Sequence, residues 1–177
     1  MTDVARPGLP TVDQVLMLPA GDRRAAPPEW EDANGHVNVS AYYDFHMRAT
    51  EGAVAELGWN EKYIERTGKS LFSLEHHLQF YDETLVGQEV SVHVRLLDRN
   101  ERLLHGVSIL VNHTTGCVAN TVEFVEAHVD LATRRTSLFL LEFTEVLDRM
   151  LEEHRRLPWS VPLNGAMGLR LAGASGA

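Results

Sequence analysis

Cysteine is almost absent from this chain, which carries only Cys117 among its 177 residues. No disulfide can therefore form within the chain, and a lone thiol cannot build a thiolate zinc site. No stretch approaches the roughly 18 apolar residues that a membrane-spanning helix needs. Residues 1–10 also lack the basic start and apolar run of a secretory signal. Together these absences predict a cytoplasmic protein.

Basic residues are outnumbered as well. Lys and Arg total 16 against 25 Asp and Glu, which gives a formal net charge of -9. Nucleic-acid binding needs clustered Lys and Arg, and no basic grouping here is longer than a pair, such as those at 134–135 and 155–156. We therefore expect no nucleic-acid partner.

The motifs of several cofactor and nucleophile chemistries are missing too. The chain has no Gly-x-Gly-x-x-Gly run, no P-loop and no Gly-x-Ser-x-Gly elbow. Their absence removes dinucleotide, phosphate-transfer and serine-nucleophile interpretations. Of the nine histidines, only His76 and His77 are adjacent, and neighbours on a strand point to opposite faces. We therefore expect no metal and no cofactor.

The distribution of proline and glycine predicts a single domain with two loose ends. Five of the seven prolines fall in the first 28 residues. We expect a loose extension over 1–11, the domain over 12–157, and a mobile, Gly/Ala-rich tail over 158–177. Within the domain, residues 12–31 are predicted to form a broken edge strand.

A long helix is predicted over 39–57. Apolar residues recur there at helical spacing, Asn38 suits the N-cap position, and Gly58 is well placed to end the helix. A shorter helix is predicted over 60–67, and a final amphipathic helix over 141–154.

Strand periodicity begins at residue 72. Apolar and polar residues alternate over 72–81, 90–96, 103–111 and 117–129, and the short turns between these segments are typical of antiparallel neighbours. We expect the four strands to meander in order, giving an α+β fold in which an antiparallel sheet wraps around the long helix. One helix leaves part of the sheet uncovered, so we expect a homodimer or a dimer of dimers joined through sheet edges.

A run rich in turn-forming and ionisable residues precedes the long helix. It reads Asp32-Ala33-Asn34-Gly35-His36-Val37-Asn38. With Tyr42 it resembles the Asp-x-x-Gly-His-x-Asn-x-x-x-Tyr signature of 4-hydroxybenzoyl-CoA thioesterase-like hotdog proteins. Residues 70–81, 103–105 and 123–130 are similar to those of betainyl-CoA thioesterases of carnitine breakdown. This resemblance covers residues 30–139 and implies a hotdog fold that hydrolyses an acyl-CoA to the free acid and CoA.

By this resemblance, Asp32 is the catalytic carboxylate. It would act as the nucleophile or as a general base on water, and the sequence leaves both roles open. Cleaving a thioester also needs donors for the oxyanion, which the unpaired amides at the start of the long helix can supply. Gly35 lets the substrate approach the main chain. His36 and Asn38 would orient water or the carbonyl, although Asn38 has a second interpretation as a helix cap.

Five further residues are candidates for substrate binding. Tyr43 is a candidate for the acyl pocket, with a place in the core as the alternative. Glu75 and His77 share a polar strand face. We expect this face either to close a site across a dimer, with Glu75 activating water or meeting a cationic acyl group, or to be an ordinary solvated surface. Arg134 and Arg135 are candidates for the CoA phosphates, because the guanidinium fork suits phosphate.

Two other functions stay open at this point. A hotdog dehydratase acting on a 3-hydroxyacyl thioester also uses an Asp–His pair, and a non-catalytic hotdog domain would bind acyl-CoA intact. The run that begins at Asp32 favours the thioesterase. The acyl group itself is open, and a short polar group such as betaine, an aromatic group and a medium chain all fit.

Overall fold

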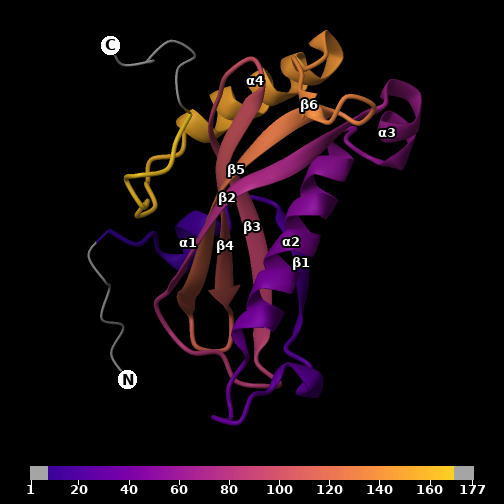
Figure 1. The fold of residues 1–177 in the computed structure, drawn as a ribbon. Helices are drawn as coiled ribbons and strands as arrows, with labels where there is room; N and C mark the ends of the chain where they lie inside the picture. Colours follow the sequence, from indigo (N-terminus) through magenta and orange to yellow (C-terminus); the bar gives the residue numbers. More distant parts are fainter. Residues whose placement is uncertain (1–7, 170–177) are drawn as a thin grey trace.

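The computed structural model describes residues 8–169 and has an α+β fold (Figure 1). Its helices are α1 (Val12–Val15), α2 (Val39–Glu56), α3 (Glu61–Thr67) and α4 (Leu141–Arg155), with a 3-10 turn η1 (Pro28–Trp30). Its strands are β1 (Ala20–Ala25), β2 (Lys69–Phe80), β3 (Glu89–Arg99), β4 (Leu103–Asn112), β5 (Cys117–Asp130) and β6 (Arg135–Thr136). The helices after residue 38 and the four long strands agree closely with the predicted ranges.

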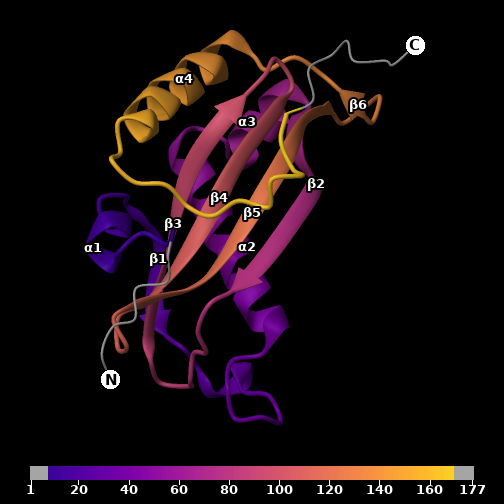
Figure 2. The ribbon, with the colours of Figure 1, turned by 90° about the vertical axis from the view of Figure 1, so that its left-hand side faces the viewer.

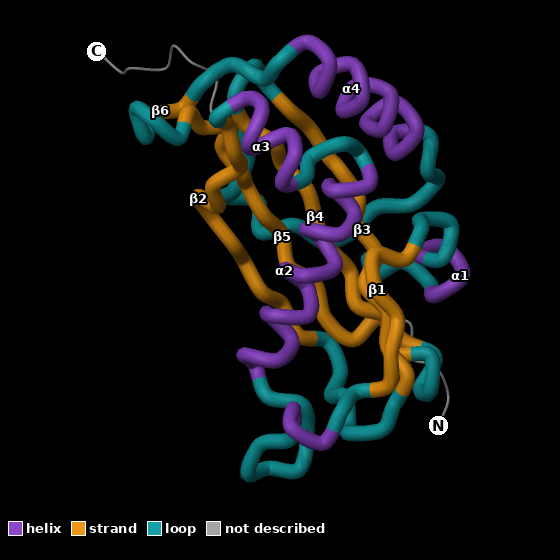
Figure 3. Tube along the Cα trace, turned by 90° about the vertical axis from the view of Figure 1, so that its right-hand side faces the viewer, coloured by secondary structure: helices purple, strands orange, loops and turns teal. Residues whose placement is uncertain are grey.

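The described strands form one antiparallel sheet in the order β1-β3-β4-β5-β2, with β6 paired to β5. Helix α2 lies lengthwise across one face of this sheet (Figures 1 and 3). Its buried side chains, Phe45 among them, pack on Val90, Val92 and Leu110 of the sheet. This is the predicted hotdog arrangement, a sheet around a central helix with a further helix near the C-terminus.

The position of β2 corrects the predicted meander. Strands β3, β4 and β5 follow one another as expected, but β2 pairs with β5 and not with β3. Strand β3 already has β1 on one edge and β4 on the other, so β2 has no place beside it. Residues 81–88 therefore form a crossover, although their length also suits a hairpin.

The ends and the middle of α2 follow from individual residues. Asn38 Oδ1 accepts a hydrogen bond from the Ala41 amide at 2.8 Å and so caps the helix. The helix stops just before Gly58, whose φ is +96°. Midway, Ala49 lies so close to Gly21 of β1 that a side chain on Gly21 would collide with the Ala49 carbonyl. Small residues thus let α2 lie directly on the sheet.

The N-terminal part of the domain differs from the predicted broken strand over 12–31. Thr11 and Gln14 form a reciprocal capping box that starts the one-turn helix α1, and strand β1 begins only at Ala20. At α1 the capping hydrogen bonds favour a helical turn, although the sequence pattern there predicted a strand. Strand β1 does lie at an edge of the sheet, as predicted.

The face of the sheet away from α2 is covered by the chain that follows α4 (Figure 2). Trp159 and Val161 are buried there against side chains that include Val107. The Asn164 amide donates to Glu123 Oε2 at 2.7 Å. Packing therefore continues past the expected boundary at 157, because apolar residues follow it. The predicted mobility of the later residues stays a prediction, and residues 1–7 and 170–177 lie outside the described chain.

Candidate active site

Residues 31–37 form a tight turn that leads directly into α2. Glu31 and Val37 pair as an isolated antiparallel bridge, and the Asp32 amide donates to the His36 carbonyl at 2.9 Å. Gly35 has a φ of +82°, a conformation that residues with a side chain rarely adopt. The turn therefore brings Asp32 and His36 together at the N-terminal end of α2.

The Asp32 carboxylate is held within this turn. Its Oδ1 accepts from the Asn34 amide at 2.8 Å, and its Oδ2 lies 3.5 Å from His36 Nδ1. Burial alone would raise the pKa of Asp32, but the hydrogen bonds from Asn34 and the charge of a protonated His36 outweigh it, so the pKa lies below its usual value. The carboxylate is therefore ionised at neutral pH, as a nucleophile or a general base must be.

Asn38 uses its whole side-chain amide to build the corner. Its Oδ1 caps α2 through the Ala41 amide, and its Nδ2 donates to the Trp30 carbonyl at 2.8 Å. The Asn38 main-chain amide donates to the same carbonyl, also at 2.8 Å. These bonds attach the turn to the start of α2. The predicted role of Asn38 in orienting water or the carbonyl stays a prediction.

A cleft of about 530 Å³ opens beside the turn. Its walls come from the turn, the start of α2 and the end of β2: His36, Val37, Val39, Tyr42, Phe80, Tyr81, Asp82 and Glu83. His36 lines this cleft directly, and the Asp32 carboxylate contacts His36. The unpaired first amides of α2 and the positive end of its dipole lie at the same corner. An ionised carboxylate and oxyanion donors are the groups that attack on a carbonyl requires.

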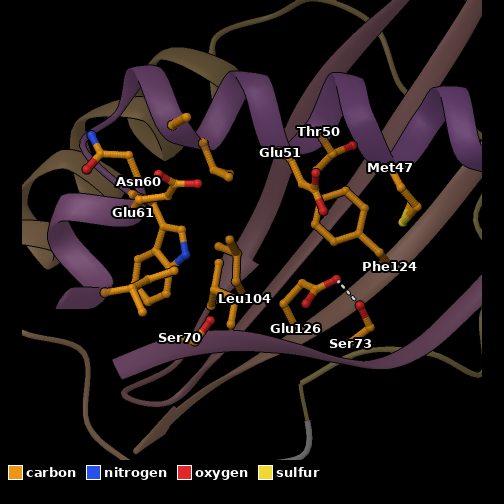
Figure 4. A pocket seen from close by; sticks show the side chains of 15 residues that line it. Met47, Thr50, Glu51, Asn60, Glu61, Ser70, Ser73, Leu104, Phe124 and Glu126 are labelled. Carbon is orange, nitrogen blue, oxygen red and sulfur yellow. Dashed lines mark hydrogen bonds between the residues drawn. The ribbon is translucent and has the colours of Figure 1, made fainter. Parts of the chain in front are cut away.

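A second cavity, of about 440 Å³, lies between α2, α3 and β2 near the other end of α2 (Figure 4). Most of its wall is apolar and includes Trp59 and Phe124. Glu51 enters from α2, and Glu126 approaches from the sheet on the opposite side. The ionisable residues that line it are all acidic, since Glu61 is the third.

A chain of hydrogen bonds crosses the seam between α2 and β2. The Tyr43 hydroxyl lies 2.7 Å from His76 Nδ1, and His76 Nε2 lies 3.2 Å from Glu126 Oε1. The Ser73 hydroxyl donates to the same Glu126 oxygen at 2.9 Å. A carboxylate oxygen only accepts, so His76 Nε2 donates to Glu126. Tyr43 is 37% exposed and lies in this seam rather than in the core.

Comparison with known proteins shows the family of this chain. The sequence model of the Thioesterase-like superfamily matches residues 26–160. The chain belongs to this superfamily. A betainyl-CoA thioesterase of Pseudomonas aeruginosa is 32% identical over 142 residues, which are 80% of this chain and 89% of that protein.

Solved structures of other proteins share the hotdog fold of this chain. A Staphylococcus aureus protein in complex with CoA superposes with a TM-score of 0.75 at 21% identity, over 85% of this chain and 93% of that one. A candidate thioesterase of Pseudomonas putida superposes with a TM-score of 0.69 at 22% identity, over 93% of this chain and 99% of that one. At these identities the likeness concerns the fold.

A β-bulge in β2 determines which of its residues face α2. Ser73 pairs with Glu126, and Glu75 pairs with the residue just before Glu126, which leaves Leu74 as an extra residue. Ser73 and His76 consequently share the face toward α2, whereas an unbroken strand would point them to opposite faces. The predicted alternation over 72–81 therefore holds only after the bulge.

Glu75 and His77 lie on the face of the sheet away from α2. His77 pairs with Glu123, and the Glu123 carboxylate binds His105 on that face at 2.8 Å. Neither Glu75 nor His77 meets Asp32 within one chain. Their predicted contact with substrate stays a prediction.

Arg134 lies in the turn between β5 and β6, and Arg135 begins β6, at the α3 end of the molecule (Figure 1). Arg134 has a φ of +57°, and its guanidinium carbon lies 5.9 Å from the centre of the Phe72 ring. Helix α2 is about 27 Å long at 1.5 Å per residue. Within one chain the two arginines are therefore far from Asp32, and their predicted role with the CoA phosphates stays a prediction.

Residues 8–169 hold no group of three or more His, Cys, Asp or Glu arranged to bind a metal ion. Over the same range, no helix combines the length and the apolar character needed to cross a membrane. The expectation of a reaction without metal or cofactor stays a prediction.

Proposed function

We propose that this protein hydrolyses an acyl-CoA thioester to the free acid and CoA. The observation that carries the proposal is the corner where an ionised Asp32 and His36 meet the amides at the start of α2. Asp32 attacks the thioester carbonyl carbon, or takes a proton from the water that does. The α2 amides stabilise the oxyanion, the carbon–sulfur bond breaks, and CoA leaves as a thiolate that takes up a proton. Where Asp32 is the nucleophile, water then hydrolyses the acyl–aspartyl anhydride, which releases the acid and restores the carboxylate. Membership of the superfamily supports this reaction.

Within this reaction class we propose a short cationic acyl group, such as betainyl, as the substrate. The relative from Pseudomonas aeruginosa is a betainyl-CoA thioesterase, and the ionisable residues that line the second cavity here are all acidic. The dehydratase alternative has no support from these relatives. A non-catalytic binding domain has no need of an ionised carboxylate beside a histidine at a cleft.

We also propose that a second copy of the chain completes the site by docking on β2. Strand β2 has β5 as its one neighbour in the described sheet, so its other edge is free. Phe72, Leu74 and Phe80 along it are 37%, 54% and 43% exposed. The opposite edge, β1, is half as long and carries charged residues at 22–24, which discourage pairing. A long free edge with exposed apolar residues favours pairing with another copy.

An antiparallel pair of β2 strands around a two-fold axis sets the end of one strand against the start of the other. Phe80, near the end of β2, lines the cleft beside Asp32, whereas Ser70, near its start, lines the acidic cavity. Such pairing joins the cleft of one copy to the cavity of the other. It also carries Arg134 of the second copy toward the cleft, where CoA phosphates need a cation. The proposed assembly is a homodimer or a dimer of dimers. The proposed location is the cytoplasm.

Thiol release from a panel of acyl-CoA substrates tests the proposed hydrolysis. We expect Asp32→Ala to lower kcat by at least about 100-fold, within the range for a general acid–base group. Asp13→Ala, an exposed carboxylate on α1 outside both hollows, serves as the matched control and should keep the wild-type rate. Wild-type turnover by Asp32→Ala, or an enoyl product without free thiol, would contradict the proposal.

A further inference from the structure

The cavity at the α3 end of α2 takes no part in the chemistry derived for Asp32. We propose that this cavity is the acyl pocket and that Glu126 on its wall is the specificity-determining residue that selects a positively charged acyl group. This inference rests on the proposed thioesterase function, because it assigns the pocket and the charge preference of that same site.

The Glu126 carboxylate is fixed in place by neighbours that leave one oxygen available. Its side chain is 15% exposed, and its hydrogen bonds from Ser73 and His76 both end on Oε1. Within residues 8–169, no hydrogen bond ends on Oε2. His76 is itself fixed by the Tyr43 hydroxyl on α2. The carboxylate is thus held against the cavity with lone pairs left for a ligand.

The rest of the cavity suits a cation that carries methyl groups in place of N–H donors. The lining has no Lys or Arg to neutralise Glu126, and Glu51 adds a second negative charge from the opposite wall. A carboxylate beside apolar walls is costly to desolvate unless an opposite charge accompanies it. Trp59 and Phe124 offer apolar and aromatic surface, which attracts quaternary ammonium groups. A neutral acyl group gains only the apolar contact, and an anionic one is repelled.

The cavity acts on the substrate bound at Asp32 of a second copy. Asn38 and Glu51 are separated by about 20 Å of helix at 1.5 Å per residue, and a short acyl group cannot span that length within one chain. The β2 pairing proposed above removes this separation, because it sets the cavity of one copy beside the cleft of the other. Glu126 of one copy therefore contacts the charged acyl group that is bound at Asp32 of the other copy.

Two substrates of one shape separate charge from size. Betainyl-CoA carries a quaternary nitrogen, and 3,3-dimethylbutanoyl-CoA has carbon in its place. The test variant is Glu126→Gln, whose amide oxygen still accepts from Ser73 and His76, so the wall stays intact. We expect kcat/KM for betainyl-CoA to fall at least about 10-fold, as for loss of a partly buried charge partner. The value for the neutral substrate should stay within about two-fold of wild type, since apolar contact is unchanged.

Matched variants distinguish this role from a general effect of charge. Glu56→Gln removes the same charge from an exposed site on α2 outside the cavity and should leave both kcat/KM values unchanged. An unchanged preference in Glu126→Gln overturns the proposal. An equal loss on both substrates also overturns it, because it would show that Glu126 supports the wall and not charge selection. A lost preference in Glu75→Gln, on the other sheet face, would transfer the role to that residue.

Binding gives a readout that does not depend on turnover. Titration calorimetry of Asp32→Asn with each substrate, with and without Glu126→Gln, should give the same loss of preference in Kd. If the wild type hydrolyses neither substrate, the proposed function fails while this measurement still decides the role of Glu126. If hydrolysis is normal and Kd shows no preference that depends on Glu126, the inference fails alone.

Discussion

The two ends of α2 differ in what each contributes to the proposed site. At its N-terminal end lies a carboxylate beside helix amides, next to a cleft whose far side is open. At its C-terminal end lies a mostly apolar cavity whose ionisable residues are all acidic. The first end combines a carboxylate with helix amides beside an open cleft, and the second end has the more apolar hollow. Under the proposed pairing, a second copy brings the two different ends together.

The two carboxylates also differ in what holds them. Asp32 is held by the main chain of its own turn, since the Asn34 amide and the neighbouring His36 are within four residues of it. Glu126 is held by side chains from another strand, through Ser73 and His76. The geometry of the proposed reactive group therefore depends on neighbouring residues of its own turn, while the group that we expect to select the substrate depends on the assembled sheet.

The largest effect that tests this comparison is recovery of activity in mixed dimers. When Asp32→Asn and Glu126→Gln chains are co-expressed with different tags and purified as a mixed dimer, one of its two sites has both residues intact. We expect betainyl-CoA hydrolysis to rise at least about 30-fold above the Asp32→Asn homodimer, because general acid–base loss is about 100-fold or more and half the sites are repaired. The measurement is thiol release per site.

The control for the mixed dimer is a double-mutant chain paired with wild type. In this dimer one chain carries both substitutions and the other carries neither. Half of the activity would therefore remain only if each site lies within one chain. If the mixture of single variants stays no more active than the average of its homodimers, Asp32 and Glu126 do not meet across the interface. Light scattering on the wild type should give twice 19.8 kDa or a multiple of that mass.

Local sequence was enough to predict the N-terminal end of α2. The glycine turn and the cap at Asn38 depend on residues a few positions apart, so composition and spacing determine them. The role predicted for Asp32 came from the resemblance of its motif and stays a prediction. Helical spacing predicted α2 and α4 for the same reason. The hotdog fold followed from one long helix beside strands of alternating pattern.

The other end of α2 depends on pairing that the sequence does not display. The bulge at Leu74 moves Ser73 to the face of His76, and alternation alone gives no signal for one extra residue. Glu126 is separated in sequence from both of its partners, so its place in a cavity depends on β2 crossing to the far edge of the sheet. The adjacent pair His76 and His77 was the one signal in the sequence, because neighbours on a strand point to opposite faces and one of the two histidines must therefore face α2.

A smaller effect tests what keeps the two ends of α2 on the sheet. His46 lies midway along α2 and is fully buried, with Nδ1 2.7 Å from the Ser108 hydroxyl and Nε2 bonded to Asn120 Oδ1. Since the amide oxygen only accepts, His46 Nε2 donates and Nδ1 accepts from Ser108. Burial lowers the pKa of His46 to about 4. The folded chain thus holds this histidine neutral.

Stability should therefore fall in mild acid. The unfolded chain protonates His46 near its usual pKa of about 6.5, so the unfolded state binds the extra proton as the pH falls from there toward 4. The stability that depends on neutral His46 is fully present above pH 6.5. At pH 5 its loss lowers the free energy of unfolding by about 2 kcal/mol. Urea unfolding at pH 8 and pH 5 measures it. His46→Gln should show a smaller pH dependence, and an unchanged one would refute the role assigned to His46.

The smallest effect separates support from chemistry at the N-terminal corner. Asn38→Ala removes the cap of α2 and should lower the free energy of unfolding by about 1 kcal/mol, measured by urea denaturation. Asn38→Ser keeps a cap oxygen and should recover most of that loss while still lacking the Nδ2 bond to Trp30. If Asn38 only supports the corner, kcat in both variants stays within about ten-fold of wild type, below the range for a group that acts in the transition state. A deeper loss of kcat in Asn38→Ser, in a chain that is nearly as stable as wild type, would mean that its amide also contacts the reacting water or carbonyl.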